Sequence, residues 1–381
     1  MVAETEFICQ QSISMLNVKY HLCVTQQHNV KVDVSPTSPP TSSLPIFAHA
    51  VSCPEIIKDS ILETPAKMFL PNVHSGSYTD IGPRGSMDDE HIQIDDLACH
   101  LGFVSNYPMP SAFYAVFDGH GGPDAAAFVK RNAMRLFFED TDMLQSYDTD
   151  EFFLEKLEDS HRRAFIRADL ALADEQSVSN SCGTTALTAL VLGRHLLVAN
   201  AGDCRAVLCR RGTAVEMSKD HRPSYLPERR RVEELGGFID DGYLNGYLSV
   251  TRALGDWDLK FPLGAASPLI AEPDVQLVTL TEEDEFLIIA CDGIWDVMSS
   301  QVAVSFVRRG LRRHSDPQQS ARDLVKEALR LNTSDNLTAI VICLSPVEKF
   351  AESCPPQRRR FKACSISEEA RNRLKSLIEG N

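Results

Sequence analysis

The sequence predicts an α+β domain in which antiparallel sheets carry helices on their outer faces. Short apolar runs that stop at Gly or Asp indicate buried strands. Longer stretches with apolar residues at three- and four-residue steps indicate helices. The two kinds of segment come in groups rather than in strict alternation, and this order favours antiparallel over parallel sheets.

The first half of this domain begins with Ala112–Phe117, an aromatic-rich run that predicts a buried strand ending at Asp118. Helices are predicted over about 124–139 and 150–173, where apolar residues recur with helical spacing. Three further apolar runs, separated by Gly-Arg and Ala-Gly-Asp turn signals, predict an antiparallel meander. They cover residues 185–192, 195–199 and 205–209.

The second half contains a basic helical stretch over Pro227–Leu235, which a Gly-Gly pair closes. Phe286–Ala290 predicts another buried strand. A helix is expected over about 316–331, because its Asp-Pro start is typical of an N-cap followed by a first-turn proline. The last predicted strand is Leu337–Cys343.

The chain has 381 residues and a formal net charge of −15, from 53 acidic and 38 basic side chains. Its 43% hydrophobic content argues against a wholly disordered chain, and the acidic excess argues against a nucleic-acid-binding body. Residues 1–70 include a Pro- and Ser-rich stretch and are expected to be a disordered tail. Residues 71–346 are expected to form one domain. A second tail, 347–381, would hold a basic patch at Gln357–Lys362 and a short helix.

The eleven cysteines show no CxxC spacing, so they predict buried free thiols in a reducing compartment rather than a zinc site. The first residues lack the basic start and the apolar stretch of a signal peptide. No run approaches the roughly 20 apolar residues that span a bilayer. We therefore expect a soluble protein of the cytoplasm, the nucleus or both, with no membrane partner.

Aspartates recur where predicted strands end. Asp118, Asp203 and Asp292 follow apolar runs, and Asp335 precedes the last one. Any single one could be an ordinary turn residue. If they lie together, they repel one another and raise each other's pKa unless cations lie between them. Oxygen ligands without clustered Cys or His favour Mg²⁺ or Mn²⁺ over zinc.

Six short segments appear in a fixed order and are specific as a set. They are Asp118–Gly122, Gly183–Ala186, Ala199–Asp203, Leu248–Asp256, Asp292–Asp296 and Asp335–Thr338. Through them, residues 76–345 resemble the metal-dependent Ser/Thr protein phosphatases of the type 2C family, most closely its plant members. The resemblance implies a four-layer α-β-β-α sandwich of two antiparallel sheets with helices on the outer faces. It also implies a metal centre at one edge, which would make 71–346 the catalytic domain.

The resemblance implies two Mg²⁺ or Mn²⁺ ions per catalytic centre. Asp118 would bridge both ions, and the backbone carbonyl of Gly119 would bind the second. Asp292 and Asp335 would hold the first ion, largely through water.

Asp203 and Asp296 match positions that hold a third, weaker ion in some family members. For Asp296, a helix cap or a surface acid stays open as the alternative.

A segment upstream matches the family pattern Arg-x-x-Met-Glu-Asp with one departure. Arg84 would grip the substrate phosphate, which its planar donor fork suits. Asp88 takes the place of the usual Glu ligand to the second ion. Asp89 matches the residue that supports this ligand without binding the ion directly. Because Asp is one methylene shorter than Glu, we expect altered occupancy or metal preference at the second ion.

The implied reaction is in-line attack on phosphorus by a water that the two ions bridge, without a phosphoenzyme. Arg84 and the ions would neutralise the phosphoryl oxygens. His120 would protonate the leaving Ser or Thr oxygen, with a loop histidine without catalytic duty as the alternative. The Cys-x5-Arg loop of tyrosine phosphatases is absent from the sequence.

The sequence therefore predicts a signalling enzyme that removes phosphate from phosphoserine and phosphothreonine in proteins. The alternative is a pseudophosphatase that binds phosphoproteins or kinases as a regulator, and Asp88 is the feature that favours it. A monomer without nucleic-acid partners is expected. The flap segment, about 236–247, contains Tyr243 but no Trp, so membership of the abscisic-acid co-receptor group is not expected.

Overall fold

The computed structural model describes residues 69–102, 110–138, 151–260 and 266–345, all of which lie in the compact unit Pro65–Asn381. The Pro- and Ser-rich stretch, the basic patch and the C-terminal helix predicted from the sequence lie outside the described residues. The predicted division into two tails and one domain therefore stays a prediction.

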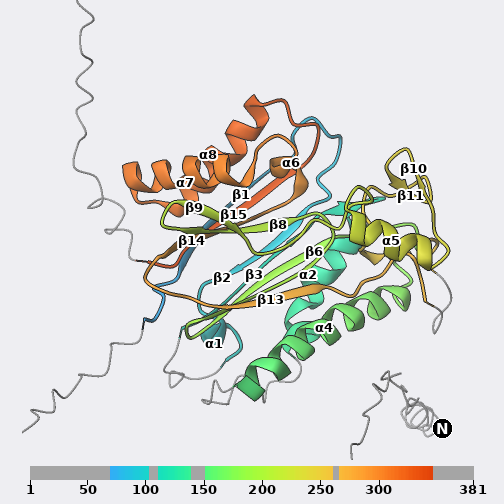
Figure 1. Cartoon of the computed structure of the whole chain (residues 1–381), viewed down its shortest axis with the longest axis horizontal. Helices are drawn as coiled ribbons and strands as arrows, with labels where there is room; N and C mark the ends of the chain where they lie inside the picture. Colours follow the sequence, from blue (N-terminus) through green and yellow to red (C-terminus); the bar gives the residue numbers. More distant parts are fainter. Residues whose placement is uncertain (1–68, 103–109, 139–150, 261–265, 346–381) are drawn as a thin grey trace, which may run out of the picture. The chain divides into compact units, whose positions relative to one another are not determined.

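The first of two large sheets contains five antiparallel strands in the order β1-β15-β14-β8-β9. Their bounds are His74–Asp80, Leu337–Cys343, Asp284–Ala290, Arg205–Arg210 and Thr213–Glu216. Two helices, α7 (Ser300–His314) and α8 (Pro317–Arg330), pack on the outer face of this sheet. Figure 1 shows both helices on one side of the sandwich.

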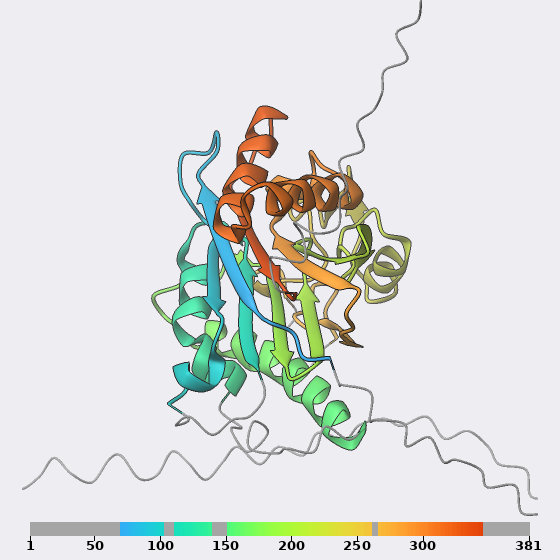
Figure 2. The same ribbon diagram turned by 90° about the vertical axis from the view of Figure 1, so that its left-hand side faces the viewer.

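The second large sheet also contains five antiparallel strands, in the order β13-β7-β6-β3-β2. Their bounds are Asp274–Thr279, His195–Ala201, Ala186–Leu192, Ser111–Phe117 and Glu90–Ile94. Helices α2 (Asp124–Phe138) and α4 (Glu151–Ala173) cover its outer face. Figures 1 and 2 show the two sheets stacked between the two helical layers. The predicted α+β class and four-layer sandwich are confirmed.

Smaller elements lie at the ends of the strands and between them. A three-stranded sheet joins β12 (Leu254–Gly255), β5 (Gly183–Thr184) and β4 (Gly119–His120), and β10 (Ile239–Asp240) pairs with β11 (Tyr243–Leu244). The short helices are α1 (Leu97–His100), α5 (Leu226–Glu234) and α6 (Asp292–Trp295).

The apolar runs are continuous because these strands are buried on both faces. Along β3, Phe113 and Phe117 pack with the helices α2 and α4, whereas Tyr114 and Val116 pack between the sheets. Neighbouring side chains of a strand point to opposite faces, so every second residue reaches the same layer. Burying side chains of this size contributes about 1.5–3 kcal/mol each relative to exposure.

The predicted meander is wrong at its last strand. Strands β6 and β7 form a hairpin in the second sheet, but β8 belongs to the first sheet, where it pairs with β14 and β9. Between β7 and β8, Gly202 has a φ of 126°, a conformation that favours glycine. The chain therefore crosses from one sheet to the other there, a change that local turn signals do not reveal because β14 is distant in sequence.

The other predicted elements are present within a few residues of their expected bounds. At the start of α8, the Asp316 side chain accepts a hydrogen bond from the Gln319 N–H at 3.1 Å, as expected of an N-cap. The sequence analysis did not predict β1, β2, β13 or α7.

Within the described ranges, all six cysteines are free and five of them are buried, as the sequence predicts. Every helix in this part of the chain is too short or too polar to cross a membrane.

Candidate active site

The predicted acidic residues meet where strands of both sheets end. Asp118 follows β3, Asp292 follows β14 and opens α6, and Asp335 precedes β15. They line a cavity of about 370 Å³ between the ends of the two sheets. The other predicted residues that line it are Arg84, Asp88, Gly119, His120 and Asp203. Asp89 lies buried next to the lining, and Asp296 lies outside it.

Three carboxylates form the centre of the cavity wall. Oxygen atoms of Asp118, Asp203 and Asp292 all lie within 4.8 Å of one another. Burial, followed by the negative charges of neighbouring aspartates, raises the pKa of Asp118 well above its usual value. The same causes raise the pKa of Asp292 to about 8. Raised pKa values of this kind are expected of carboxyl groups that bind a cation, when the cation is not bound.

Asp89 lies buried beside this cluster. Its Oδ2 accepts a hydrogen bond from the Thr338 hydroxyl at 2.7 Å, which ties the start of β2 to β15. Asp89, Asp118 and Cys291 also place ligand atoms within 4.8 Å of one another. Burial raises the pKa of Asp89 to about 6.

Backbone contacts fix the position of Asp118. The Thr185 N–H donates to the Asp118 carbonyl at 2.9 Å, and the Asp118 N–H donates to Thr185 Oγ1 at 3.2 Å. The Thr184 hydroxyl also donates to the Asp118 carbonyl, at 3.1 Å. The Gly-Thr-Thr segment recognised in the sequence therefore holds the loop that carries Asp118.

Asn336 is a residue of the site to which the sequence analysis assigned no role. Its side-chain nitrogen donates to the carbonyls of Ile81 and Ser86 at 2.8 and 2.9 Å, and its Oδ1 accepts from the Asp88 N–H at 2.9 Å. It thereby fixes the loop that carries Asp88 against Asp335. The sequence signal that could have identified Asn336 was its position directly after Asp335 in a recognised segment.

Asp88 points its carboxylate into the site. Its Oδ1 is buried and has no hydrogen-bond partner among the described residues. A buried oxygen without a partner is costly, and a divalent cation with oxygen ligands would relieve that cost. The shorter side chain of this position is therefore compatible with metal binding.

Arg84 lies on the rim of the cavity with its side chain 54% exposed. Its Nη2 contacts Asp335 Oδ2 at 2.6 Å, and its Nε donates to the Ser334 carbonyl at 3.0 Å. Neither contact uses Nη1. The arginine is thus oriented by the predicted metal ligand Asp335 beside it.

His120 forms a pair with Asp256, the last residue of the recognised segment Leu248–Asp256. His120 Nε2 lies 2.8 Å from Asp256 Oδ2, and the Asp256 side chain is buried. A Cβ atom at Gly183 would lie 2.0 Å from that carboxylate oxygen and 2.5 Å from His120 Nε2, so only glycine fits beside the pair. Three of the recognised segments therefore meet at one His–Asp contact.

Arg222 is the second residue that the sequence analysis missed. Its guanidinium contacts Asp203 at 3.0 Å, Asp292 at 3.1 Å and Asp296 at 2.7 Å. Arg222 is thus the link between Asp296 and the rest of the site. The sequence places it in a His-Arg-Pro segment ahead of the flap, which by itself indicates only a residue near the substrate entrance.

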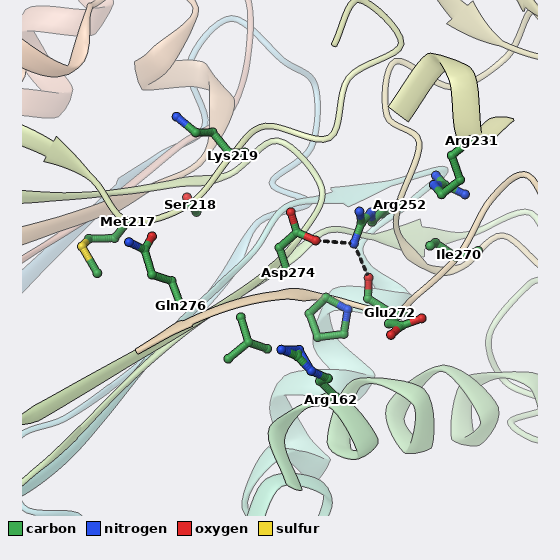
Figure 3. Close-up of a pocket in the computed structure, with 12 residues that line it drawn as sticks. Arg162, Met217, Ser218, Lys219, Arg231, Arg252, Ile270, Glu272, Asp274 and Gln276 are labelled. Atoms are coloured by element: carbon green, nitrogen blue, oxygen red, sulfur yellow. Dashed lines mark hydrogen bonds and ion pairs between the residues drawn. The ribbon is translucent and has the colours of Figure 1, made fainter. Parts of the chain in front are cut away.

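A second hollow, of about 560 Å³, lies beside β13 and contains none of the predicted site residues (Figure 3). Its Arg252 contacts the Glu272 carbonyl at 2.9 Å and the Asp274 carboxylate at 2.8 Å. Two further cations of its wall, Lys219 and Arg231, pair with Glu216 and Glu228, which lie outside it. Chemistry of the predicted kind therefore belongs to the smaller, acidic cavity.

Comparisons with known proteins agree with this site. A sequence model described as "Protein phosphatase 2C" matches residues 79–337. "Probable protein phosphatase 2C 13" of Arabidopsis thaliana is 55% identical over 390 residues. "Probable protein phosphatase 2C 2" of Oryza sativa subsp. japonica is 56% identical over 389 residues. Both alignments cover 100% of this chain and 100% of the relative.

Solved structures share the fold. A serine-threonine phosphatase 2C from Toxoplasma gondii superposes with a TM-score of 0.59 and 24% identity, over 72% of this chain and 97% of that one. A C. elegans sex determining protein gives a TM-score of 0.63, also at 24% identity, over 73% of this chain and 66% of that one. The family match and the full-length relatives carry the assignment beyond the fold. The chain belongs to the protein phosphatase 2C family.

Proposed function

We propose that this protein phosphatase hydrolyses phosphoserine and phosphothreonine in proteins at the acidic cavity, with Mg²⁺ or Mn²⁺ and without a phosphoenzyme. The observation that carries the proposal is the approach of Asp118, Asp203 and Asp292 oxygens to within 4.8 Å of one another in one cavity. Like charges held this close are favourable only with cations between them.

The donor set of the cavity suits hard divalent cations. Asp118, Asp292, Asp335 and Asp88 would hold two ions, with the Gly119 carbonyl as a further oxygen donor. When bound, such ions neutralise phosphoryl charge and lower the pKa of a water so that it can attack phosphorus near neutral pH.

Arg84 is placed to bind the substrate phosphate. Its Nε and Nη2 contact Ser334 and Asp335, which fixes the plane of the guanidinium. Nη1 keeps its two donors for phosphate oxygens at the cavity rim. The ion pair with Asp335 couples the position of the phosphate to that of the metal ligands.

His120 is placed to protonate the leaving Ser or Thr oxygen. Asp256 engages Nε2, so Nδ1 is the ring nitrogen that can serve the cavity. The buried carboxylate orients the ring. This assignment uses Asp256 as a positioning residue rather than as an acid in the reaction.

The cavity mouth supports a macromolecular substrate. Tyr243 and Tyr247 line the mouth from the flap and are 46% and 76% exposed. Exposed aromatic side chains beside a phosphate site provide contact area for the residues that flank a phosphorylated position.

The test is hydrolysis of a phosphothreonine peptide by wild type and Asp118→Ala in Mn²⁺, Mg²⁺ or EDTA. We expect metal-dependent turnover in wild type alone. Asp174→Asn, which changes an exposed aspartate just after α4, is the matched control and should retain wild-type activity. Equal activity of wild type and Asp118→Ala in every condition would refute the proposed metal centre.

Binding of phosphopeptide by wild type without turnover in either metal would instead identify a pseudophosphatase, the alternative that Asp88 favours. Kinase partners, the monomeric state and the cytoplasmic or nuclear location stay predictions from the sequence.

A further inference from the structure

Arg222 places one cation among three carboxylates that come from different parts of the chain. Its Nε lies 3.0 Å from Asp203 Oδ2, and its Nη2 lies 3.1 Å from Asp292 Oδ2 and 2.7 Å from Asp296 Oδ1. We call Asp203, Asp292 and Asp296 the acidic triad. The Arg222 side chain is 29% exposed, and that of Asp203 is 3% exposed.

The backbone beside Arg222 is clamped, so the guanidinium is directed toward the triad. His221 is fully buried, and its N–H donates to the Gly202 carbonyl at 2.9 Å. The Gly202 N–H donates back to His221 Nδ1 at 3.2 Å. The Thr251 N–H and hydroxyl donate to the His221 carbonyl at 2.8 and 3.0 Å.

The far side of the His221 ring is also held. Its Nε2 lies 3.2 Å from Asp274 Oδ2, and Asp274 is in turn paired with Arg252 in the wall of the second hollow (Figure 3). The turn that carries Asp203 and the segment that carries Arg222 are therefore joined by the hydrogen bonds between Gly202 and His221. Arg222 belongs to the architecture of the acidic triad.

The triad contains three carboxyl groups, and Arg222 supplies one positive charge. A divalent cation entering the same place would meet the guanidinium at close range, where like charges repel. Arg222 also borders a separate hollow of about 360 Å³ whose wall includes Asp220 and Glu216. These acids are paired with Arg205 and Lys219, so the hollow offers the long arginine side chain space among polar groups when it leaves the triad.

We propose that Arg222 is the resident cation of the acidic triad, and that a third divalent ion binds there only when the guanidinium withdraws. The inference rests on the proposed metal-dependent function. It gives Arg222 two effects: it holds Asp203, Asp292 and Asp296 together in the metal-free protein, and it weakens third-ion binding. The apparent affinity is reduced by the fraction of molecules whose triad is open.

The first measurement is Mn²⁺ binding to full-length wild type, Arg222→Met and Arg222→Lys, with bound ions counted from the loss of the free Mn²⁺ EPR signal. We expect Arg222→Met to bind one more Mn²⁺ than wild type at the same free concentration, with roughly tenfold tighter affinity. Arg222→Lys should be intermediate, because an ammonium keeps the charge but lacks the planar fork.

The second measurement is thermal unfolding, which does not depend on activity. In EDTA, Arg222→Met should melt roughly 3–8 °C below wild type, because three acids lose their cation. Saturating Mn²⁺ should close or reverse this gap. Arg230→Met removes an exposed arginine of α5 and is the control, expected to match wild type in both measurements.

The outcomes separate the inference from the function on which it rests. Equal Mn²⁺ number and affinity in wild type and Arg222→Met would overturn the inference alone. Absence of Mn²⁺ binding by wild type, together with metal-independent hydrolysis, would overturn the proposed function and the inference with it.

Discussion

Two buried carboxylate clusters in this protein have opposite electrostatics. In the cavity, burial and neighbouring aspartates raise the pKa of Asp292 to about 8. Just before the flap in sequence, the Glu228 side chain is 4% exposed against 18% for Asp292, yet hydrogen bonds and charges from Arg252 and Arg231 more than offset burial and lower its pKa. Glu228 lies in the basic stretch Pro227–Leu235, whereas Asp292 lies among aspartates. Their neighbours decide whether the acid is already paired or is available to an added cation.

The hydrogen bonds of the two clusters explain the difference. Glu228 accepts from Arg231 at 2.8 Å, from Arg252 at 2.7 and 3.0 Å, and from the Thr251 hydroxyl at 2.7 Å, so both its oxygens are satisfied within the protein. Among the described residues, Asp292 shares the one cation Arg222 with Asp203 and Asp296. A carboxylate whose oxygens all have partners within the protein stabilises the fold. Carboxylates without enough such partners are available to bind a metal ion.

The largest expected effect is the loss of activity in Asp292→Asn. Removing one charged ligand of the proposed metal centre should lower kcat/KM by about a thousandfold, equivalent to about 4 kcal/mol of transition-state stabilisation. Phosphopeptide hydrolysis in Mn²⁺ measures it. The same variant should be at least as stable as wild type in EDTA at pH 8, because it removes one of several repelling acids. A less stable metal-free variant would contradict the contrast drawn between the two clusters.

In contrast to Asp292→Asn, Glu228→Gln should lower the stability of the protein. Two arginines, one of them only 12% exposed, would lose their carboxylate, and we expect the free energy of unfolding to fall by about 3 kcal/mol. Urea unfolding in EDTA measures it. Glu233→Gln on the same helix breaks the exposed pair with Arg229 and should cost less than about 1 kcal/mol. Equal losses in both variants would show that burial of the Glu228 pair has no energetic consequence.

The next largest effect concerns pH: the free energy of unfolding should depend on pH differently for the two clusters. With folded-state pKa values of about 8 for Asp292 and about 6 for Asp203, against 3.8 unfolded, the folded metal-free protein binds more protons. Its free energy of unfolding should therefore fall as pH rises from about 4 to 8, by up to about 1.4 kcal/mol per pH unit for each extra proton. Urea unfolding in EDTA at several pH values measures this slope.

Two variants provide the controls for that slope. Asp292→Asn should flatten it between pH 6 and 8. Glu228→Gln should shift the whole curve down without changing the slope there, because a lowered pKa contributes stability that is lost only as pH falls below the usual range for Glu. A flat wild-type curve in EDTA would mean that the cavity acids carry ordinary pKa values.

The smallest expected effect concerns Asp88. Asp88→Glu restores the usual length of this ligand and should preserve activity at limiting Mn²⁺ or raise it on the order of threefold. Titration of activity against Mn²⁺ measures it, with Asp174→Glu as the control on an exposed acid. A large loss would show that the loop held by Asn336 is built around the shorter side chain.

Much of this site could be predicted from the sequence because its residues occur in short, ordered segments. Asp118, Asp292 and Asp335 follow or precede recognisable strands, so local pattern and family resemblance place them together. Arg222 and Asn336 could not be assigned in this way. Arg222 acts through contacts with acids 19 to 74 positions away, and Asn336 acts through a loop about 250 positions upstream. Neither contact leaves a local signature.

The fold shows the same division. Continuous apolar runs such as Ser111–Phe117 indicate strands buried on both faces, and this needs no partner to be known. The sheet to which β8 belongs is different, because pairing with β14 is a long-range choice that the neighbouring turn does not specify.

By itself, the sequence determined the layered class, the acids that line the cavity and the enzyme family, since these depend on residue type and spacing. Only the tertiary structure decided which sheet receives each strand, which cation each buried acid meets, and which aspartate orients His120. These depend on distances between segments far apart in the chain, and the free energy of a buried charge is set by such distances.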